Sequence, residues 1–120
     1  MKNFTKLLFI TLLCLSSLFS IAQQGDTLEI QRNQTGKISF ARFKPDANKK
    51  VQDAVSFLKA VLHAKPEDEL RLIKQTTDKL GITHHLYKQY YKGIKVENAE
   101  YLVHGKNGII ETINGDFQGM

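Results

Sequence analysis

Four histidines are the residues of this sequence best suited to chemistry: His63, His84, His85 and His104. A zinc protease of the His-Glu-x-x-His type needs two imidazoles four residues apart on one helical face, with a glutamate between them as the base. The sequence contains no such run. His84 and His85 are adjacent in a stretch typical of a strand, where successive side chains point to opposite faces. We therefore expect them to be ordinary polar strand residues, and the sequence predicts no metal ligands.

The sequence also lacks a nucleophile or a pair of carboxylates arranged as in a catalytic site. The sequence has no Gly-x-Ser-x-Gly elbow, and its one cysteine, Cys14, lies in the N-terminal apolar run. Residues 67–69 are contiguous acids typical of a solvated face, and Glu97 with Glu100 is typical of an exposed hairpin edge. We therefore expect a chain that is not an enzyme and carries no catalytic residue or cofactor-binding residue.

A binding surface is the function class that remains. The tyrosines Tyr87, Tyr90, Tyr91 and Tyr101 fall in the strand-rich half, and tyrosine is enriched at protein interfaces. The alternative is that alternate members lie in the core, because strand residues face opposite ways. With 17 basic and 12 acidic residues the chain has a net charge of +5, but the charges alternate in sign, which indicates no nucleic-acid partner.

The first 22 residues are typical of a secretory signal peptide. Lys2 and Lys6 precede an apolar run over residues 7–15, and cleavage is expected between Ala22 and Gln23. The run is shorter than the roughly 20 apolar residues of a membrane-spanning helix, so no stable membrane anchor is expected after cleavage. The prediction is an exported protein, either periplasmic or extracellular.

The elements that position the binding surface follow from hydrophobic periodicity. Two short strands, Thr27–Gln31 and Lys37–Phe43, are expected to form a hairpin. A helix is then expected to start near Pro45, Asp46 or Asn48. Its apolar stripe consists of Val51, Ala54, Val55, Leu58, Val61 and Leu62, with Phe57 at the margin.

The second half of the chain is rich in β-branched and aromatic residues divided by glycine turns. Strands are expected over Thr83–Tyr91, Val96–His104 and Ile109–Asn114. Residues 66–80 are ambiguous, because periodicity alone favours a second helix there. The predicted fold class is α+β, with one amphipathic helix packed on a curled antiparallel β-sheet arranged as a meander.

Four sequence blocks occur in a fixed order near the C-terminal end. They are Gly81-x-Thr83-His84, Gln89-x-Tyr91-x-Gly93-Ile94-x-Val96, Ala99-Glu100-Tyr101-x-Val103-His104 and Asn114-Gly115-Asp116-Phe117. In order and spacing they resemble the fungalysin/thermolysin propeptide (FTP) domain of secreted thermolysin-like, bacillolysin-type zinc metallopeptidases. The resemblance favours a strand near Leu70–Thr76 over the second helix.

The resemblance implies a propeptide that acts as intramolecular chaperone and autoinhibitor of a protease catalytic domain, in cis or in trans. Zinc and calcium are expected only in that catalytic domain, and none of the matched residues is catalytic in the family. Three positions depart from the family pattern, namely Leu86 in place of arginine, Lys88 in place of glutamine and Lys95 in place of proline. These departures weaken the expectation that the charge contacts of the family are preserved.

The expected organisation is a signal peptide over 1–22, an extended segment or hairpin over 23–47, an FTP-like domain over 48–117 and a short tail over 118–120. The sequence ends at Met120 without a His-Glu-x-x-His catalytic domain. Two interpretations stay open: a truncated zymogen, or a free-standing secreted module that binds or inhibits a protease in trans.

Overall fold

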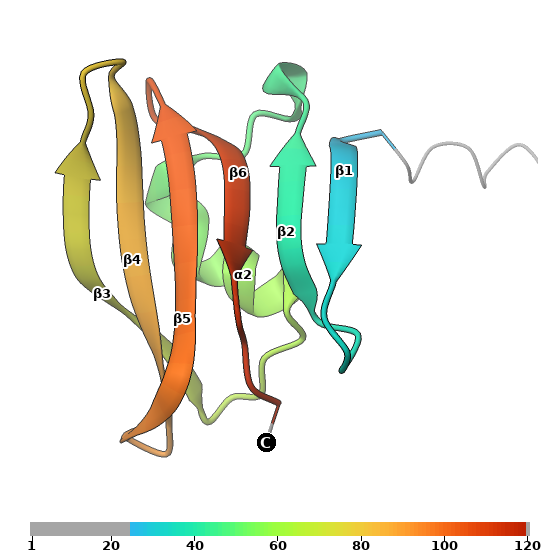
Figure 1. Cartoon of the computed structure of the whole chain (residues 1–120), viewed down its shortest axis with the longest axis vertical. Helices are drawn as coiled ribbons and strands as arrows, with labels where there is room; N and C mark the ends of the chain where they lie inside the picture. Colours follow the sequence, from blue (N-terminus) through green and yellow to red (C-terminus); the bar gives the residue numbers. More distant parts are fainter. Residues whose placement is uncertain (1–24, 120) are drawn as a thin grey trace, which may run out of the picture.

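The computed structural model describes residues 25–119, so the predicted signal peptide and its cleavage site at Ala22 and Gln23 lie outside the described residues. Within residues 25–119, six strands form one antiparallel sheet in the order β1-β2-β6-β5-β4-β3. Helix α2 packs against one face of this sheet (Figure 1). The predicted α+β class is confirmed, and strands β3 to β6 form the expected meander. The bounds are β1 Thr27–Arg32, β2 Ile38–Phe43, α2 Ala54–Val61, β3 Asp68–Thr77, β4 Ile82–Tyr91, β5 Ile94–Lys106 and β6 Ile109–Gly115.

The ambiguous segment is a strand, as the family resemblance favoured. β3 runs antiparallel to β4 from the pair Asp68 and Tyr91 to the pair Thr77 and Thr83. A register shift between Leu72 and Lys74 interrupts its alternation, and every residue of β3 after Leu70 is exposed. β3 is an edge strand, so hydrophobic periodicity could not identify it.

The helix is shorter than its apolar pattern predicts. Two 3₁₀ turns, Pro45–Ala47 and Val51–Asp53, precede α2. Between them Lys50 bridges to Ile109, while the Val51 amide donates to the Gly108 carbonyl. Because this backbone pairs with the β5–β6 hairpin, the α-helix begins only at Ala54.

The prediction that Val55 belongs to the buried stripe of the helix is wrong. Val55 is 39% exposed, whereas Ala54, Leu58 and Leu62 are almost completely buried. These three lie four residues apart and define the centre of the buried face, which leaves Val55 on the solvent side of the helix. Phe57 lies at the margin as expected, partly buried, with its ring centroid 5.4 Å from that of Phe43.

The core lies between α2 and the sheet and draws on nearly every element. Its members are Ile38, Ala41, Phe43, Ala54, Leu58, Leu62, Leu70, Tyr87, Tyr101, Val103, Ile110, Ile113 and Phe117. The N-terminal hairpin therefore shares one sheet and one core with the later strands, while the domain bounds drawn from the sequence stay a prediction.

Candidate protein-binding surface

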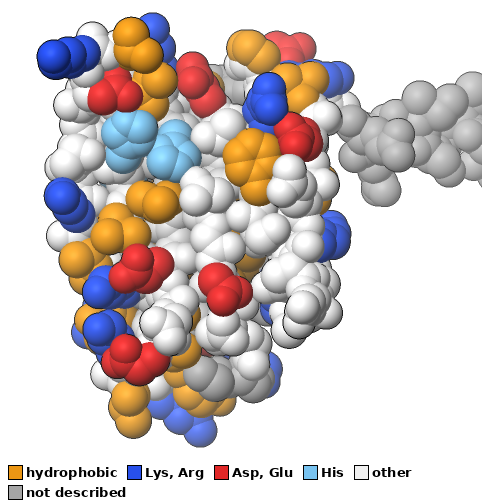
Figure 2. Space-filling model, viewed as in Figure 1, with side chains coloured by type: hydrophobic (Ala, Val, Ile, Leu, Met, Phe, Trp, Pro, Cys, Tyr) orange, Lys and Arg blue, Asp and Glu red, His pale blue; other side chains and the backbone are white. Residues whose placement is uncertain are grey.

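The sheet has one covered face and one open face, which we call the open face throughout. On β4 and β5 the residues toward the helix, such as Tyr87 and Val103, are buried. Their neighbours Leu86 and Leu102 pair with each other across the strands on the other side and are partly exposed. No helix or strand within residues 25–119 covers that side (Figure 1). Figure 2 shows apolar, charged and histidine side chains mixed on it.

Aromatic and charged side chains contact one another on the part of the open face nearest the β4–β5 turn. The Arg71 guanidinium lies 3.9 Å from the centre of the Tyr90 ring, and its Nε donates to Glu69 at 3.0 Å. Lys88 Nζ lies 3.3 Å from the Glu100 carboxylate on the neighbouring strand. Lys88, one of the departures from the family pattern, thus has a partner on the same face.

A row of polar side chains crosses the open face further along the strands. His84 and His104 are cross-strand partners whose Nδ1 atoms lie 2.6 Å apart. The remaining nitrogens contact oxygen atoms: His84 Nε2 lies 3.0 Å from Asp78 Oδ2, and His104 Nε2 lies 2.7 Å from Asn114 Oδ1. His84 pairs across the strands with His104 and not with its sequence neighbour His85, a pairing that no spacing in the sequence indicates.

Asp78 anchors one end of this row and also closes the β3–β4 turn. Its Oδ1 accepts hydrogen bonds from the amides of Leu80 and Ile82. The hydrogen bond from His84, followed by the Ile82 amide, holds the pKa of the Asp78 carboxyl below its usual range. Gly81, at φ +79°, supplies the left-handed residue that this turn requires.

His85 lies on the covered face, opposite to His84. It is 6% exposed, and its Nδ1 has no hydrogen-bond partner among the described residues. Burial, assisted by the charge of His84, lowers its pKa. The two adjacent histidines therefore cannot share a ligand, as the strand alternation predicts.

Gln89 ties the C-terminal segment to the sheet. It is 1% exposed, and its Nε2 donates to Asp68 Oδ1 at 3.1 Å and to the Gln118 carbonyl at 2.7 Å. The Gln118 amide donates back to Gln89 Oε1 at 2.9 Å. Asp68, also buried, accepts the Lys65 amide at 2.8 Å. The buried polar groups of this cluster thus satisfy one another.

Tyr101 and Gly115 hold β5 against its neighbours. The buried Tyr101 hydroxyl donates to the Ile38 carbonyl at 2.6 Å, and burial raises its pKa above the usual value. A Cβ at Gly115 would overlap the Glu100 carbonyl and come within 2.7 Å of the Tyr101 Cα. Only glycine allows this close approach of β6 to β5.

The other motif positions are also structural or lie on the sheet surface. Thr83 Oγ1 donates to the Gly105 carbonyl at 3.1 Å, and Gly93 has a left-handed φ of +77° in the β4–β5 turn. Ala99 and Val103 are buried in β5. Tyr91 and Val96 are partly exposed, whereas Glu100 is exposed. Of the four tyrosines, Tyr87 and Tyr101 are core residues, while Tyr90 and Tyr91 reach the surface.

Within residues 25–119 no group of three or more His, Cys, Asp or Glu side chains is placed to hold a metal ion. A groove of about 590 Å³ lies between β2 and the β5–β6 hairpin, lined by residues such as Leu28, Phe43 and Ile109. Arg42, which also lines it, is paired with Glu29 at 2.8 Å. The described helices include none long and apolar enough to cross a membrane.

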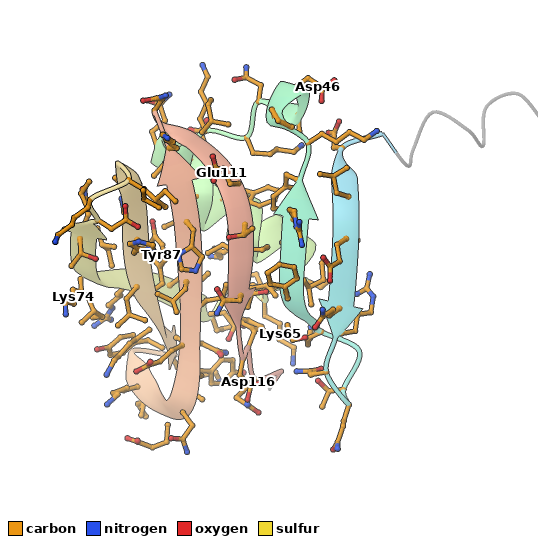
Figure 3. The ribbon with its side chains drawn as sticks, turned by 45° about the horizontal axis from the view of Figure 1, so that its top comes forward. Asp46, Lys65, Lys74, Tyr87, Glu111 and Asp116 are labelled. Carbon is orange, nitrogen blue, oxygen red and sulfur yellow. The ribbon has the colours of Figure 1, made fainter. Side chains whose placement is uncertain are left out.

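Figure 3 shows where labelled side chains of both faces lie. Tyr87 sits on β4 and Glu111 on the inner strand β6, whereas Lys74 lies on the edge strand β3. Asp116 lies at the C-terminal end of β6, where its amide donates to the Glu100 carbonyl at 2.9 Å.

Comparison with known proteins finds a family match in the second half of the chain. Residues 68–117 match the Fungalysin/Thermolysin Propeptide Motif. The chain is also 35% identical over 57 residues to bacillolysin from Bacillus amyloliquefaciens, a match that covers 47% of this chain and 11% of bacillolysin. The matched motif begins at the first residue of β3 and ends at the buried Phe117, so it includes the whole β3–β6 meander.

Proposed function

We propose that residues 68–117, which match the Fungalysin/Thermolysin Propeptide Motif, act as a non-catalytic propeptide, and that the chain binds the catalytic domain of a thermolysin-like zinc metallopeptidase. In this role it assists folding of the protease and inhibits it until the two are separated. The observation that carries the proposal is the match of the whole β3–β6 meander to this motif. Bacillolysin, a relative over 57 residues of the chain, supports the thermolysin-like type of partner.

The open face is the surface that we assign to the protease. It combines partly exposed apolar residues such as Leu86 and Leu102 with the Arg71–Tyr90 stack and the Lys88–Glu100 pair. A standard protein interface buries about 800 Å² on each partner, with aromatic and arginine side chains at its centre. A rigid surface that binds the native protease more tightly than its unfolded states stabilises the native protease by mass action.

Export is part of the proposal. It rests on the predicted signal peptide over residues 1–22, and it places the chain in the compartment where a secreted protease matures. Zinc and calcium belong to the proposed catalytic partner rather than to the propeptide function of this chain.

The experiment is a binding and inhibition assay with the catalytic domain of a bacillolysin-type protease. Increasing amounts of the purified chain are expected to slow peptide hydrolysis, and adding the chain to denatured catalytic domain is expected to raise the activity recovered on refolding. Leu102→Arg on the open face is expected to weaken inhibition at least about tenfold, because it places an unpaired charge in a desolvated interface.

The matched control is Ile94→Arg, which also introduces an arginine, at a residue that is 73% exposed at the start of β5. Its inhibition is expected to stay within about twofold of the parent chain. Neither inhibition nor improved refolding at a large excess of the chain would contradict the proposal for the protease tested. Inhibition without improved refolding would instead favour a free-standing inhibitor acting in trans.

A further inference from the structure

The histidine pair on the open face brings one nitrogen of each ring into direct contact. His84 and His104 face each other through their Nδ1 atoms at 2.6 Å, with ring centroids 4.9 Å apart and ring planes at 72°. The His84 side chain is 32% exposed, so the pair is open to solvent. Figure 2 shows two histidine side chains lying side by side on this face.

The outer partners decide where the ring protons lie. The Asp78 carboxylate has only acceptor atoms when ionised, so His84 Nε2 must carry the hydrogen that points to Asp78 Oδ2. Asn114 presents its Oδ1, also an acceptor, to His104 Nε2. A neutral imidazole carries one hydrogen, so both Nδ1 atoms then carry lone pairs directed at each other. Two lone pairs that face each other at this distance repel unless a proton or a metal ion lies between them.

We propose that the Nδ1 atoms of His84 and His104 are ligands of a divalent transition-metal ion of the zinc, nickel or copper type, with water completing its coordination. Imidazole nitrogen is a favoured ligand of these ions. Zinc–nitrogen bonds are about 2.0–2.1 Å long, so two such ligands at a tetrahedral angle lie about 3.3 Å apart. The rings need to separate by less than about 1 Å to reach this distance.

The surroundings of the pair match those of metal-bound histidines. A ligating histidine usually donates its second N–H to a carboxylate or carbonyl oxygen, which fixes the tautomer and the ring orientation. Asp78 and Asn114 occupy these positions, one on each ring. Thr76 on β3 is the register partner of His84, and Thr112 on β6 is the register partner of His104, so a threonine flanks the site on each side.

The test is calorimetric titration of the chain with Zn²⁺, in a Cys14→Ser background that removes the only thiol. One ion is expected to bind per chain. His84→Asn and His104→Asn are each expected to weaken binding at least about tenfold, and Asp78→Asn by about 10–100-fold through loss of ring orientation. The matched control is His63→Asn, an exposed histidine at φ +52°, a conformation that asparagine tolerates. Its affinity is expected to equal that of the parent.

Nitrogen NMR of the imidazole rings gives a second readout. In the zinc-loaded chain both rings are expected to carry their hydrogen on Nε2, with Nδ1 shifted by the metal. Zinc affinity that is unchanged in the double variant His84→Asn/His104→Asn would overturn the proposal, as would rings that share a proton between their Nδ1 atoms at saturating Zn²⁺. Because the titration contains no protease, its failure leaves the propeptide proposal intact, and the reverse also holds.

Discussion

At the residue scale, the motif positions of this chain act mainly by closing the sheet. Gln89 holds the C-terminal segment through Gln118 and satisfies the buried Asp68. Tyr101 reaches across the core to the backbone of β2. Gly115 allows two strands to approach closely. These residues fix the shape of the sheet, and with it the shape of the open face to which we assign binding.

Replacing Gln89 with methionine tests this account of the buried polar cluster. Gln89→Met keeps the volume but leaves Asp68 Oδ1 without its partner and releases Gln118, so the free energy of unfolding is expected to fall by about 2–4 kcal/mol. Urea denaturation measures the change. The control Gln75→Met, at an exposed position of β3, is expected to stay within about 0.5 kcal/mol of the parent. Equal stability of the two variants would contradict the assigned role.

Tyr101 predicts how stability depends on alkaline pH. Its folded-state pKa is raised by burial above the unfolded value of about 10, so the unfolded chain loses this proton first. Stability is therefore complete below pH 10 and falls as the pH rises above it. Tyr101→Phe is expected to lower stability at pH 8 by about 1–2 kcal/mol, since the hydrogen bond to Ile38 is lost, and to flatten the decline between pH 9 and 11. The free energy of unfolding is measured by urea denaturation at each pH. An equal decline above pH 9 in the parent chain and in Tyr101→Phe would contradict this prediction.

Sequence reasoning could place single residues on faces but could not pair them across strands. The opposite orientations of His84 and His85 follow from alternation alone. The contact between His84 and His104 depends on the β4–β5 register, which shifts between Lys88 and Tyr90. The Gln89–Gln118 clamp likewise needs the path of the chain after β6. No local pattern contains either piece of information.

At the element scale, strands bounded by glycine turns were predictable and edge elements were not. β4, β5 and β6 extend the predicted ranges by a few residues at most. β3 has only two buried residues, Asp68 and Leu70, and a register shift that breaks its alternation. The α-helix begins later than its apolar repeat predicts, because the backbone just before it pairs with the sheet through Lys50 and Ile109. This tertiary contact outweighs the local pattern.

The two faces of α2 give a matched pair of substitutions. Leu58 is fully buried, so Leu58→Ala is expected to destabilise the chain by about 2–5 kcal/mol. Val55 is 39% exposed on the same helix, so Val55→Ala is expected to change stability by less than about 1 kcal/mol. Thermal unfolding followed by circular dichroism measures both. A larger effect at Val55 than at Leu58 would mean that the helix is rotated on the sheet.

At the scale of the whole molecule, the folding unit is larger than the matched motif. Residues 68–117 supply four strands, but β2 pairs with β6 along the other edge of the meander. Six of the core residues come from the hairpin and the helix: Ile38, Ala41, Phe43, Ala54, Leu58 and Leu62. Without them the covered face of the meander would meet water.

A fragment of residues 68–120 is therefore expected not to fold alone. It exposes β6 as a new sheet edge, removes the acceptor of the Tyr101 hydroxyl at Ile38, and uncovers the apolar face that α2 shields. A four-stranded sheet of this size without a covering layer has too little buried apolar surface to offset its chain entropy. Circular dichroism and hydrogen exchange are expected to show cooperative unfolding for the full chain and none for the fragment. Protected amides in the fragment would instead show that the meander is an independent domain to which the hairpin and the helix are additions.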